Sequence, residues 1–232
     1  MSAPLLVEFY LKLPQPQIGD DPDLLQAGMR ESMNAFRDAV GAKYTEGTLQ
    51  RLLTSSETSI RRAAALATGL IGTMRSNPHL SGVLRDTDTL VRKFAVESLW
   101  EIWFRGGTPD QNGQLQQAIR LPDIAQTLAA LDDLVRTAPD FAEAYNQRAT
   151  LYFRRGEYAR SVADCETTLR LNPYHYGAAS GMGQSYLRMN RPRAALRAFR
   201  QALEINPSIE NLRDTIRGLE TALDDAAREG GE

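Results

Sequence analysis

A short phrase recurs at a fixed interval in the second half of the sequence and limits what this chain can fold into. An aliphatic stretch that ends in proline occurs as VRTAP, LRLNP and LEINP, and these copies end at Pro139, Pro173 and Pro207. The prolines are 34 residues apart both times. A constant period of this size predicts stacked copies of one helical unit, because a single unit cannot bury its own apolar face.

Two full copies of this unit follow each other along the chain. Residues 142–173 and 176–207 align at the 34-residue offset, and each copy divides into two helical stretches, with a break near Gly156 in the first. Small residues such as Ala149 and Gly183 let two antiparallel helices approach closely. The terminal prolines end each second helix, because proline and its predecessor disfavour helical continuation. The pattern therefore predicts two helical hairpins.

These residues resemble the tetratricopeptide repeat. The second stretch of each copy carries the order Ala-x-x-x-aromatic-x-x-Ala-Leu-x-aliphatic-Asn-Pro, complete from Ala195 to Pro207 and looser from Ser161 to Pro173, where Cys165 replaces the aromatic residue. The segment 125–139 keeps the register and looks like the second helix of a degenerate unit. The resemblance implies a stack of helical hairpins.

A further amphipathic helix is predicted after the last repeat. Apolar residues recur three or four positions apart, which is typical of a one-sided helix; they are Ile209, Leu212, Ile216, Leu219 and Leu223. The opposite face is charged, as expected for a helix that caps a repeat array.

The first half carries a different repeat. Residues 52–72 align with residues 83–103 at an offset of 31, and each copy has a polar turn, an aliphatic-Arg pair and an apolar helix. This form resembles the HEAT repeat in its short variety of about 30 residues. We expect Arg61 and Arg92 to bridge back to the turn of their own or an adjacent unit, and side-chain oxygens of the turns to cap the second helices.

The two repeats together predict an all-α fold, a right-handed α-solenoid of helical hairpins in which HEAT-like units precede tetratricopeptide units and a capping helix. Residues 1–20 contain three prolines and little periodicity, so we expect an extended N-terminal segment. The HEAT-like repeats occupy residues 21–104 and begin with an amphipathic helix. Residues 105–123 are rich in glycine and proline and form a linker around at most one short helix. Residues 124–228 form the tetratricopeptide domain with its C-terminal capping helix.

Composition excludes several other classes of protein. The net charge of −2 argues against bulk electrostatic attraction to nucleic acid or anionic membrane. No apolar run approaches the roughly 18 residues of a membrane helix, and the N-terminus lacks the pattern of a secretory signal peptide. The single cysteine, Cys165, rules out an internal disulfide and is predicted to be a small buried hydrophobe. We expect a cytoplasmic protein.

No catalytic constellation is present in the sequence. His79 and His175 are the only histidines, and neither lies at a spacing typical of a metal site. There is no phosphate-binding loop, nucleophile elbow or dinucleotide fingerprint. The sequence therefore predicts no enzyme, no cofactor and no metal site. The cluster of Tyr174, His175 and Tyr176 is interpreted as a structural junction at the entrance of the next hairpin.

The resemblance to tetratricopeptide repeats implies that the first helix of each unit lines a concave groove. The groove positions are Glu143, Asn146, Thr150, Phe153, Arg154, Gly177, Ser180, Gln184, Leu187 and Arg188. Amides and hydroxyls at these positions suit an extended peptide backbone, and the arginines suit carboxylates. We therefore predict a non-catalytic protein–protein interaction module or scaffold that binds a peptide or protein partner. A structural spacer with solvated residues at these positions is the alternative. The clamp of the chaperone-tail-binding subclass is not reproduced, because Asn146 and Gly181 replace its lysine and asparagine.

Two other functions remain as alternatives. The arginines Arg193, Arg197 and Arg200 share one helix face and could bind nucleic acid or an acidic partner. A solvated face with Glu204 paired to Arg200 is favoured, because no stacking aromatic residues accompany the arginines. The HEAT-like half is also similar to repeat proteins associated with chromophore lyases that handle bilins, which implies an accessory role in such an enzyme.

Overall fold

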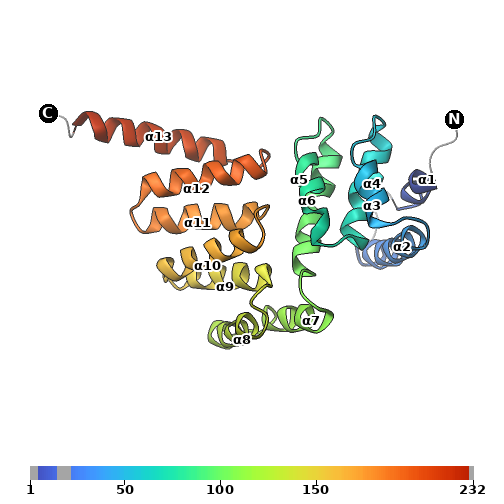
Figure 1. Ribbon diagram of the computed structural model, residues 1–232, viewed down its shortest axis with the longest axis horizontal. Coiled ribbons are helices and arrows are strands. Elements are labelled where there is room, and N and C mark those ends of the chain that lie inside the picture. Colours follow the sequence, from blue (N-terminus) through green and yellow to red (C-terminus); the bar gives the residue numbers. More distant parts are fainter. Residues whose placement is uncertain (1–4, 15–21, 230–232) are drawn as a thin grey trace. The chain divides into compact units, whose positions relative to one another are not determined.

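The computed structural model describes residues 5–14 and 22–229, and all regular structure within them is helical (Figure 1). The prediction of an all-α fold built from helical hairpins is thereby confirmed. The chain divides into two compact units, Met1–Ile102 and Trp103–Glu232, and each has its own core.

The first unit contains the two hairpins of the 31-residue repeat. Its helices are α1 (Leu5–Leu11), α2 (Pro22–Lys43), α3 (Glu46–Leu52), α4 (Thr58–Ile71), the short 3-10 helix η1 (Met74–Ser76), α5 (Asn77–Val83) and α6 (Thr89–Phe104), whose last two residues belong to the second unit. The hairpins are α3–α4 and α5–α6. Leu53 and Leu84 are equivalent under the repeat and both are buried, and the same holds for Ala64 and Ala95. Equivalent positions thus supply the core of both hairpins.

The two repeat arginines brace the turns of these hairpins, and Arg61 also joins one hairpin to the next. Each donates to two backbone carbonyls of its own turn, Arg61 at 3.0 and 3.2 Å and Arg92 at 2.7 and 3.1 Å. Arg61 also forms a bidentate pair with Asp86 in the turn of the next hairpin, at 2.6 and 2.9 Å, and this hydrogen-bonded guanidinium holds the pKa of Asp86 below its ordinary value. Both predicted kinds of bridge are confirmed. Asp88 caps α6 at 3.0 Å, whereas Glu57 makes no side-chain cap for α4.

The start of the chain differs from the prediction. Residues 1–20 were expected to be extended, but Leu5–Leu11 form helix α1; residues 1–4 and 15–20 lie outside the described part. Leu6 and Val7 are buried, and the backbone amide of Leu6 donates to the Tyr44 hydroxyl at 2.9 Å. A helix this short is marginal by itself. Packing against α2 and α4 stabilises α1, and local periodicity could not reveal that packing.

The second unit is a stack of antiparallel helices (Figure 1). They are α7 (Pro109–Ala118), α8 (Ile124–Thr137), α9 (Ala142–Arg154), α10 (Tyr158–Leu171), α11 (Tyr176–Arg188), α12 (Pro192–Ile205) and α13 (Leu212–Glu229). The two full copies of the 34-residue repeat are the hairpins α9–α10 and α11–α12. Successive helices pack on one another, as expected for a solenoid.

Helix α7 occupies half of the predicted linker. Residues 105–123 were expected to hold at most one short helix, and α7 is that helix. A capping box starts it, in which Thr108 and Gln111 bond each other's backbone amides. Its buried Leu115 shares a core with Leu131 of α8. The segment is therefore the packed partner of α8, which the sequence alignment could not identify.

The second helix of each repeat ends where the recurring phrase predicts. Helices α8, α10 and α12 each stop two residues before the prolines Pro139, Pro173 and Pro207. Within the last hairpin, the ring of Phe199 lies against Gly183, and a Cβ placed on Gly183 would be 2.5 Å from that ring. The small residue at this position is thus required by the close approach of α11 and α12.

Helix α13 covers the end of the array, as predicted. Leu212 and Ile216 are buried against Phe199 and Ala202 of α12. The charged residues on its other face are exposed; they include Arg213, Asp214 and Arg217. One apolar face buried against the repeats and one charged face toward solvent is the arrangement of a capping helix.

Candidate partner-binding surface

The first helices of the two full repeats, α9 and α11, lie next to each other and carry most of the predicted groove positions. Some of these side chains are exposed and others half-buried; the set is Thr150, Phe153, Arg154, Ser180, Gln184, Leu187 and Arg188. Their spacing of three or four residues places the members from each helix on one face of that helix. We call this set the α9–α11 surface.

Three predicted groove residues do not belong to this surface, and one of them, Gly177, has no side chain. Glu143 and Asn146 are only 1% and 7% exposed. One carboxylate oxygen of Glu143 accepts hydrogen bonds from Asn146 at 3.0 Å and Gln147 at 2.6 Å, and the other oxygen lies 2.9 Å from His175 Nε2. The carboxylate is thus occupied inside the protein. The sequence pattern failed here because His175 is 32 residues away along the chain.

His175 explains why this carboxylate can be buried. Its imidazole is 0% exposed, and Nδ1 accepts the backbone N–H of Ala178 at 3.0 Å, which caps α11. Because Nδ1 accepts, we assign the proton of the neutral ring to Nε2, from which it is donated to Glu143. Trp103 stacks on the imidazole with ring centroids 4.1 Å apart, and Tyr176 meets Trp103 edge-on at 5.3 Å. His175 therefore links α9 to the start of α11.

An aromatic residue that the sequence did not single out stands beside the α9–α11 surface. Tyr158, the first residue of α10, meets the Phe153 ring edge-on with centroids 5.5 Å apart. The Arg188 guanidinium lies 5.6 Å from the centre of the Tyr158 ring, and its Nε donates to the tyrosine hydroxyl at 3.1 Å. We call Phe153, Tyr158 and Arg188 the Tyr158 cluster. Its position after the Gly156 turn was the only sequence signal.

The charge of the surface is positive. Within the described residues, neither Arg154 nor Arg188 has a carboxylate within ion-pair distance. Since Glu143 is buried, the predicted surface retains two guanidiniums and no acidic side chain. Arginine forms planar, bidentate bonds with carboxylates. The arrangement therefore suits a ligand that combines a carboxylate with an apolar group for Phe153 or Leu187.

The described residues offer little for other chemistry. They contain no group of three or more His, Cys, Asp or Glu side chains that could hold a metal ion. Cys165 is buried, and burial raises the pKa of its thiol to about 12. A thiol in this environment is a poor nucleophile. In the same residues, no helix is both long and apolar enough to cross a bilayer.

Comparison with known families assigns both repeats. Residues 140–208 match the sequence profile of the tetratricopeptide repeat, and residues 45–141 match that of HEAT repeats. The second match runs through α7 and α8. The chain thus contains tetratricopeptide repeats, with HEAT-like repeats before them, as the sequence predicted.

Several known proteins are similar in sequence to part of this chain. A TPR repeat-containing protein of Rhizobium etli is 32% identical over 124 residues, which cover 52% of this chain and 61% of that protein. Anaphase-promoting complex subunit 3 of Schizosaccharomyces pombe is 31% identical over 84 residues, 36% of this chain and 13% of its own length. Human superkiller complex protein 3 is 28% identical over 92 residues, 39% of this chain and 6% of its own length. The chain therefore spans less than two thirds of each relative.

Two solved structures are similar at a lower level. The first TPR domain of RPAP3, bound to an HSP90 peptide, has a TM-score of 0.42 and 20% identity, covering 50% of this chain and 88% of that one. A thermophilic TPR protein of Thermus thermophilus has a TM-score of 0.38 and 20% identity, covering 86% and 98%.

Proposed function

We propose that the second unit is a protein-interaction module that binds a segment of a partner protein across the α9–α11 surface. The Tyr158 cluster carries this proposal, because two aromatic rings and a guanidinium stand together there. Tyr, Phe and Arg are enriched in protein interfaces, and Tyr and Arg are frequent among the residues that dominate binding energy. The tetratricopeptide repeats support the same function, since solenoids of this kind use extended surfaces for binding.

The surface indicates the chemistry of the segment. Arg154 and Arg188 favour a carboxylate, and the half-buried Phe153 and Leu187 favour an apolar side chain next to it. Gln184 carries an exposed amide that can pair with a peptide backbone. An extended segment with one acidic and one apolar residue a few positions apart meets these requirements.

The test begins with peptides selected on the intact protein. A library of random peptides is selected on the full chain, and the dissociation constants of the selected peptides are measured by fluorescence polarisation. The variant Phe153→Ala/Arg154→Glu/Arg188→Glu removes an apolar anchor and reverses two charges. We expect it to weaken binding by about 30-fold or more, because losing anchors of this type costs about 2 kcal/mol or more in total.

The matched control is Arg170→Glu/Arg213→Glu, which reverses two exposed charges elsewhere in the second unit. Its affinity should stay within about threefold of wild type, as screened charges outside an interface contribute little. Equal affinities for the wild type and for the variant at Phe153, Arg154 and Arg188 would rule out this surface as the binding site.

We further propose that the chain acts without catalysis, as a small scaffold in the cytoplasm. This is supported by the repeat architecture and by the burial of its single cysteine, Cys165. The chromophore-lyase alternative makes a different prediction. A visible absorbance band that stays with the purified protein would favour that alternative over a scaffold.

A further inference from the structure

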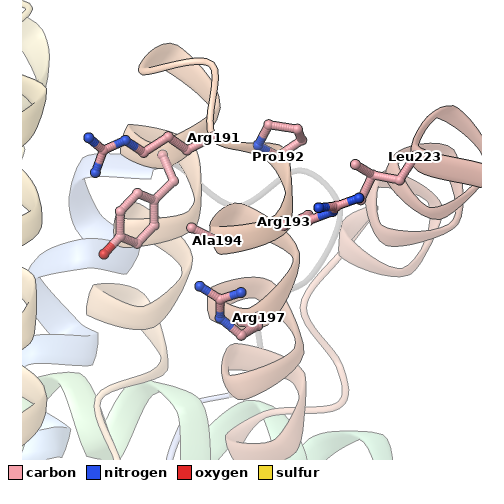
Figure 2. A pocket seen from close by; sticks show the side chains of 7 residues that line it. Arg191, Pro192, Arg193, Ala194, Arg197 and Leu223 are labelled. Carbon is pink, nitrogen blue, oxygen red and sulfur yellow. The ribbon is translucent and has the colours of Figure 1, made fainter. Parts of the chain in front are cut away.

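A pocket lined by arginines lies where α12 begins, beside the end of α11 and the second half of α13 (Figure 2). Its volume is about 570 Å³. The side chains that matter for its chemistry are Tyr186, Arg191, Pro192, Arg193, Arg197 and Leu223. Figure 2 shows the Arg191, Arg193 and Arg197 guanidiniums spread around this region, with Leu223 on the opposite side of Arg193 from Arg191. The pocket thus combines cationic groups with an apolar wall.

The positive charge of this pocket is not neutralised within the part of the chain that the structure describes. None of the guanidiniums of Arg191, Arg193 and Arg197 has a carboxylate within ion-pair distance there. Arg200, one turn further along α12, differs from them, because its guanidinium forms an ion pair with Glu220 of α13 at 2.6 Å. The three pocket arginines therefore differ from those of an ordinary exposed helix face, where arginines form ion pairs with nearby carboxylates.

One acidic group does approach the pocket from α10. Glu166 lines the hollow next to it together with Arg197, and its carboxylate accepts a hydrogen bond from the Tyr186 hydroxyl at 3.4 Å. A single carboxylate cannot balance three guanidiniums, so the pocket keeps an excess of positive charge. This excess is available to an anionic ligand.

The pocket is separate from the α9–α11 surface. On α11, Gln184 and Arg188 are four residues apart and share one face, whereas Tyr186 lies between them in sequence and points to the other side of the helix. Variants of the two sites can therefore be made independently, and either site can fail a binding test while the other passes.

We propose that this pocket binds an acidic segment of a partner protein, with its carboxylates on the arginines and an apolar side chain against Leu223 and Pro192. Charge complementarity selects the carboxylates, since three arginines line the pocket and one acid, Glu166, lines the hollow next to it. The apolar wall selects a peptide over a small inorganic anion, which would leave Leu223 and Pro192 uncovered. The volume of about 570 Å³ accommodates a few side chains.

Nucleic acid fits these features less well. The Tyr186 ring is half-buried and its hydroxyl is held by Glu166, so no free aromatic face is offered for stacking on a base. The net charge of the chain is −2, and α13 brings the exposed Asp224 next to Leu223 in sequence. A long polyanion meets repulsion from the net negative charge of the whole chain, whereas a short segment meets only the charges near the pocket.

The test uses the full chain and a fluorescein-labelled peptide Gly-Glu-Glu-Leu-Glu-Glu-Gly, with affinity measured by fluorescence polarisation at low ionic strength. The variant Arg193→Gln/Arg197→Gln should weaken binding by about tenfold, because two charge-assisted contacts are lost at a partly exposed site. The matched control Arg170→Gln/Arg213→Gln removes two exposed guanidiniums elsewhere and should change affinity less than about threefold. Far-UV circular dichroism and the unfolding midpoint establish that each variant is folded.

A second variant separates the apolar wall from the charges. Leu223→Ser should weaken binding of the leucine-containing peptide but leave an all-glutamate peptide of equal length unchanged. Its side chain is half-buried at the surface, so we expect the fold to tolerate the change. If both peptides weaken equally, or neither does, the pocket does not bind an apolar side chain as proposed.

Further probes give results that would overturn the proposal. A glutamine version of the peptide should not bind, and if it binds as well as the glutamate peptide then charge is not what is recognised. Preferential binding of a phosphoserine peptide or of an oligothymidine would assign the pocket to phosphate or nucleic acid instead. Loss of binding in Arg154→Glu/Arg188→Glu, with retention in Arg193→Gln/Arg197→Gln, would place the acidic peptide on the α9–α11 surface.

Discussion

Replacing His175 with leucine should destabilise the second unit strongly, because the imidazole faces the buried carboxylate of Glu143. Both side chains are 0% exposed, and Nε2 lies 2.9 Å from the carboxylate oxygen. Removing one partner of a buried pair costs about 3–5 kcal/mol. The donors Asn146 and Gln147 remain on the other oxygen, which points to the lower end of that range. Loss of the cap of α11 adds about 1 kcal/mol, so we expect roughly 4 kcal/mol in all.

The measurement is urea-induced unfolding of the full chain, followed by far-UV circular dichroism and by tryptophan fluorescence. Trp103 stacks on His175, so in a Trp100→Phe background its emission reports on the second unit. The exposed His79 supplies a matched control, and His79→Leu should change the unfolding free energy by less than about 0.5 kcal/mol. The double variant Glu143→Leu/His175→Leu completes the cycle.

The cycle isolates the interaction between the two side chains. Because the double variant leaves no buried carboxylate without its donor, it should cost less than the sum of the single variants by about 1–3 kcal/mol. Additive effects, or a loss below about 1 kcal/mol for His175→Leu alone, would refute the reasoning that this pair holds α9 to α11.

Three further predictions concern packing and titration. Gly183→Ala should lower the free energy of unfolding by about 1–3 kcal/mol, since the added Cβ would lie 2.5 Å from an aromatic ring. Gly181→Ala should not, because its added Cβ would lie 3.9 Å from the nearest atom. Cys165, whose thiol pKa is raised by burial to about 12, should stay unlabelled by a thiol reagent at neutral pH until the protein is unfolded. Because the pKa of Asp86 is lowered in the folded state, its ionisation contributes stability that is present above about pH 4 and is lost as the pH falls toward the folded-state pKa. Arg61→Gln should therefore reduce the dependence of the unfolding free energy on pH, measured by urea unfolding between about pH 6 and 3.

Much of the fold could be predicted because the signals are local. The prolines Pro139, Pro173 and Pro207 end helices through their own covalent geometry, whatever surrounds them. The bridges of Arg61 and Arg92 to their own turns span only five or six residues, so the repeat alignment was enough to predict them.

The candidate binding surface was harder to predict. The family register placed Glu143 in a groove, but its hydrogen-bond partner His175 comes from the next repeat. Tyr158 was missed because its role depends on its contact with Arg188, which lies 30 residues further along the chain. Side-chain exposure is set by neighbours that are distant in sequence, and a single chain carries little record of them.

The sequence by itself determined that this protein is built from helical hairpins of two kinds, because a repeat period and helix-ending residues act through local backbone geometry. Only the tertiary structure decided which polar groups are available to a partner. It buries Glu143 against His175. In the part of the chain that the structure describes, it also leaves Arg193 and Arg197, which line a pocket with Leu223 of another helix, without a carboxylate at ion-pair distance. Burial and electrostatic pairing are properties of the packed helices, and they arise only when segments far apart in the chain come together.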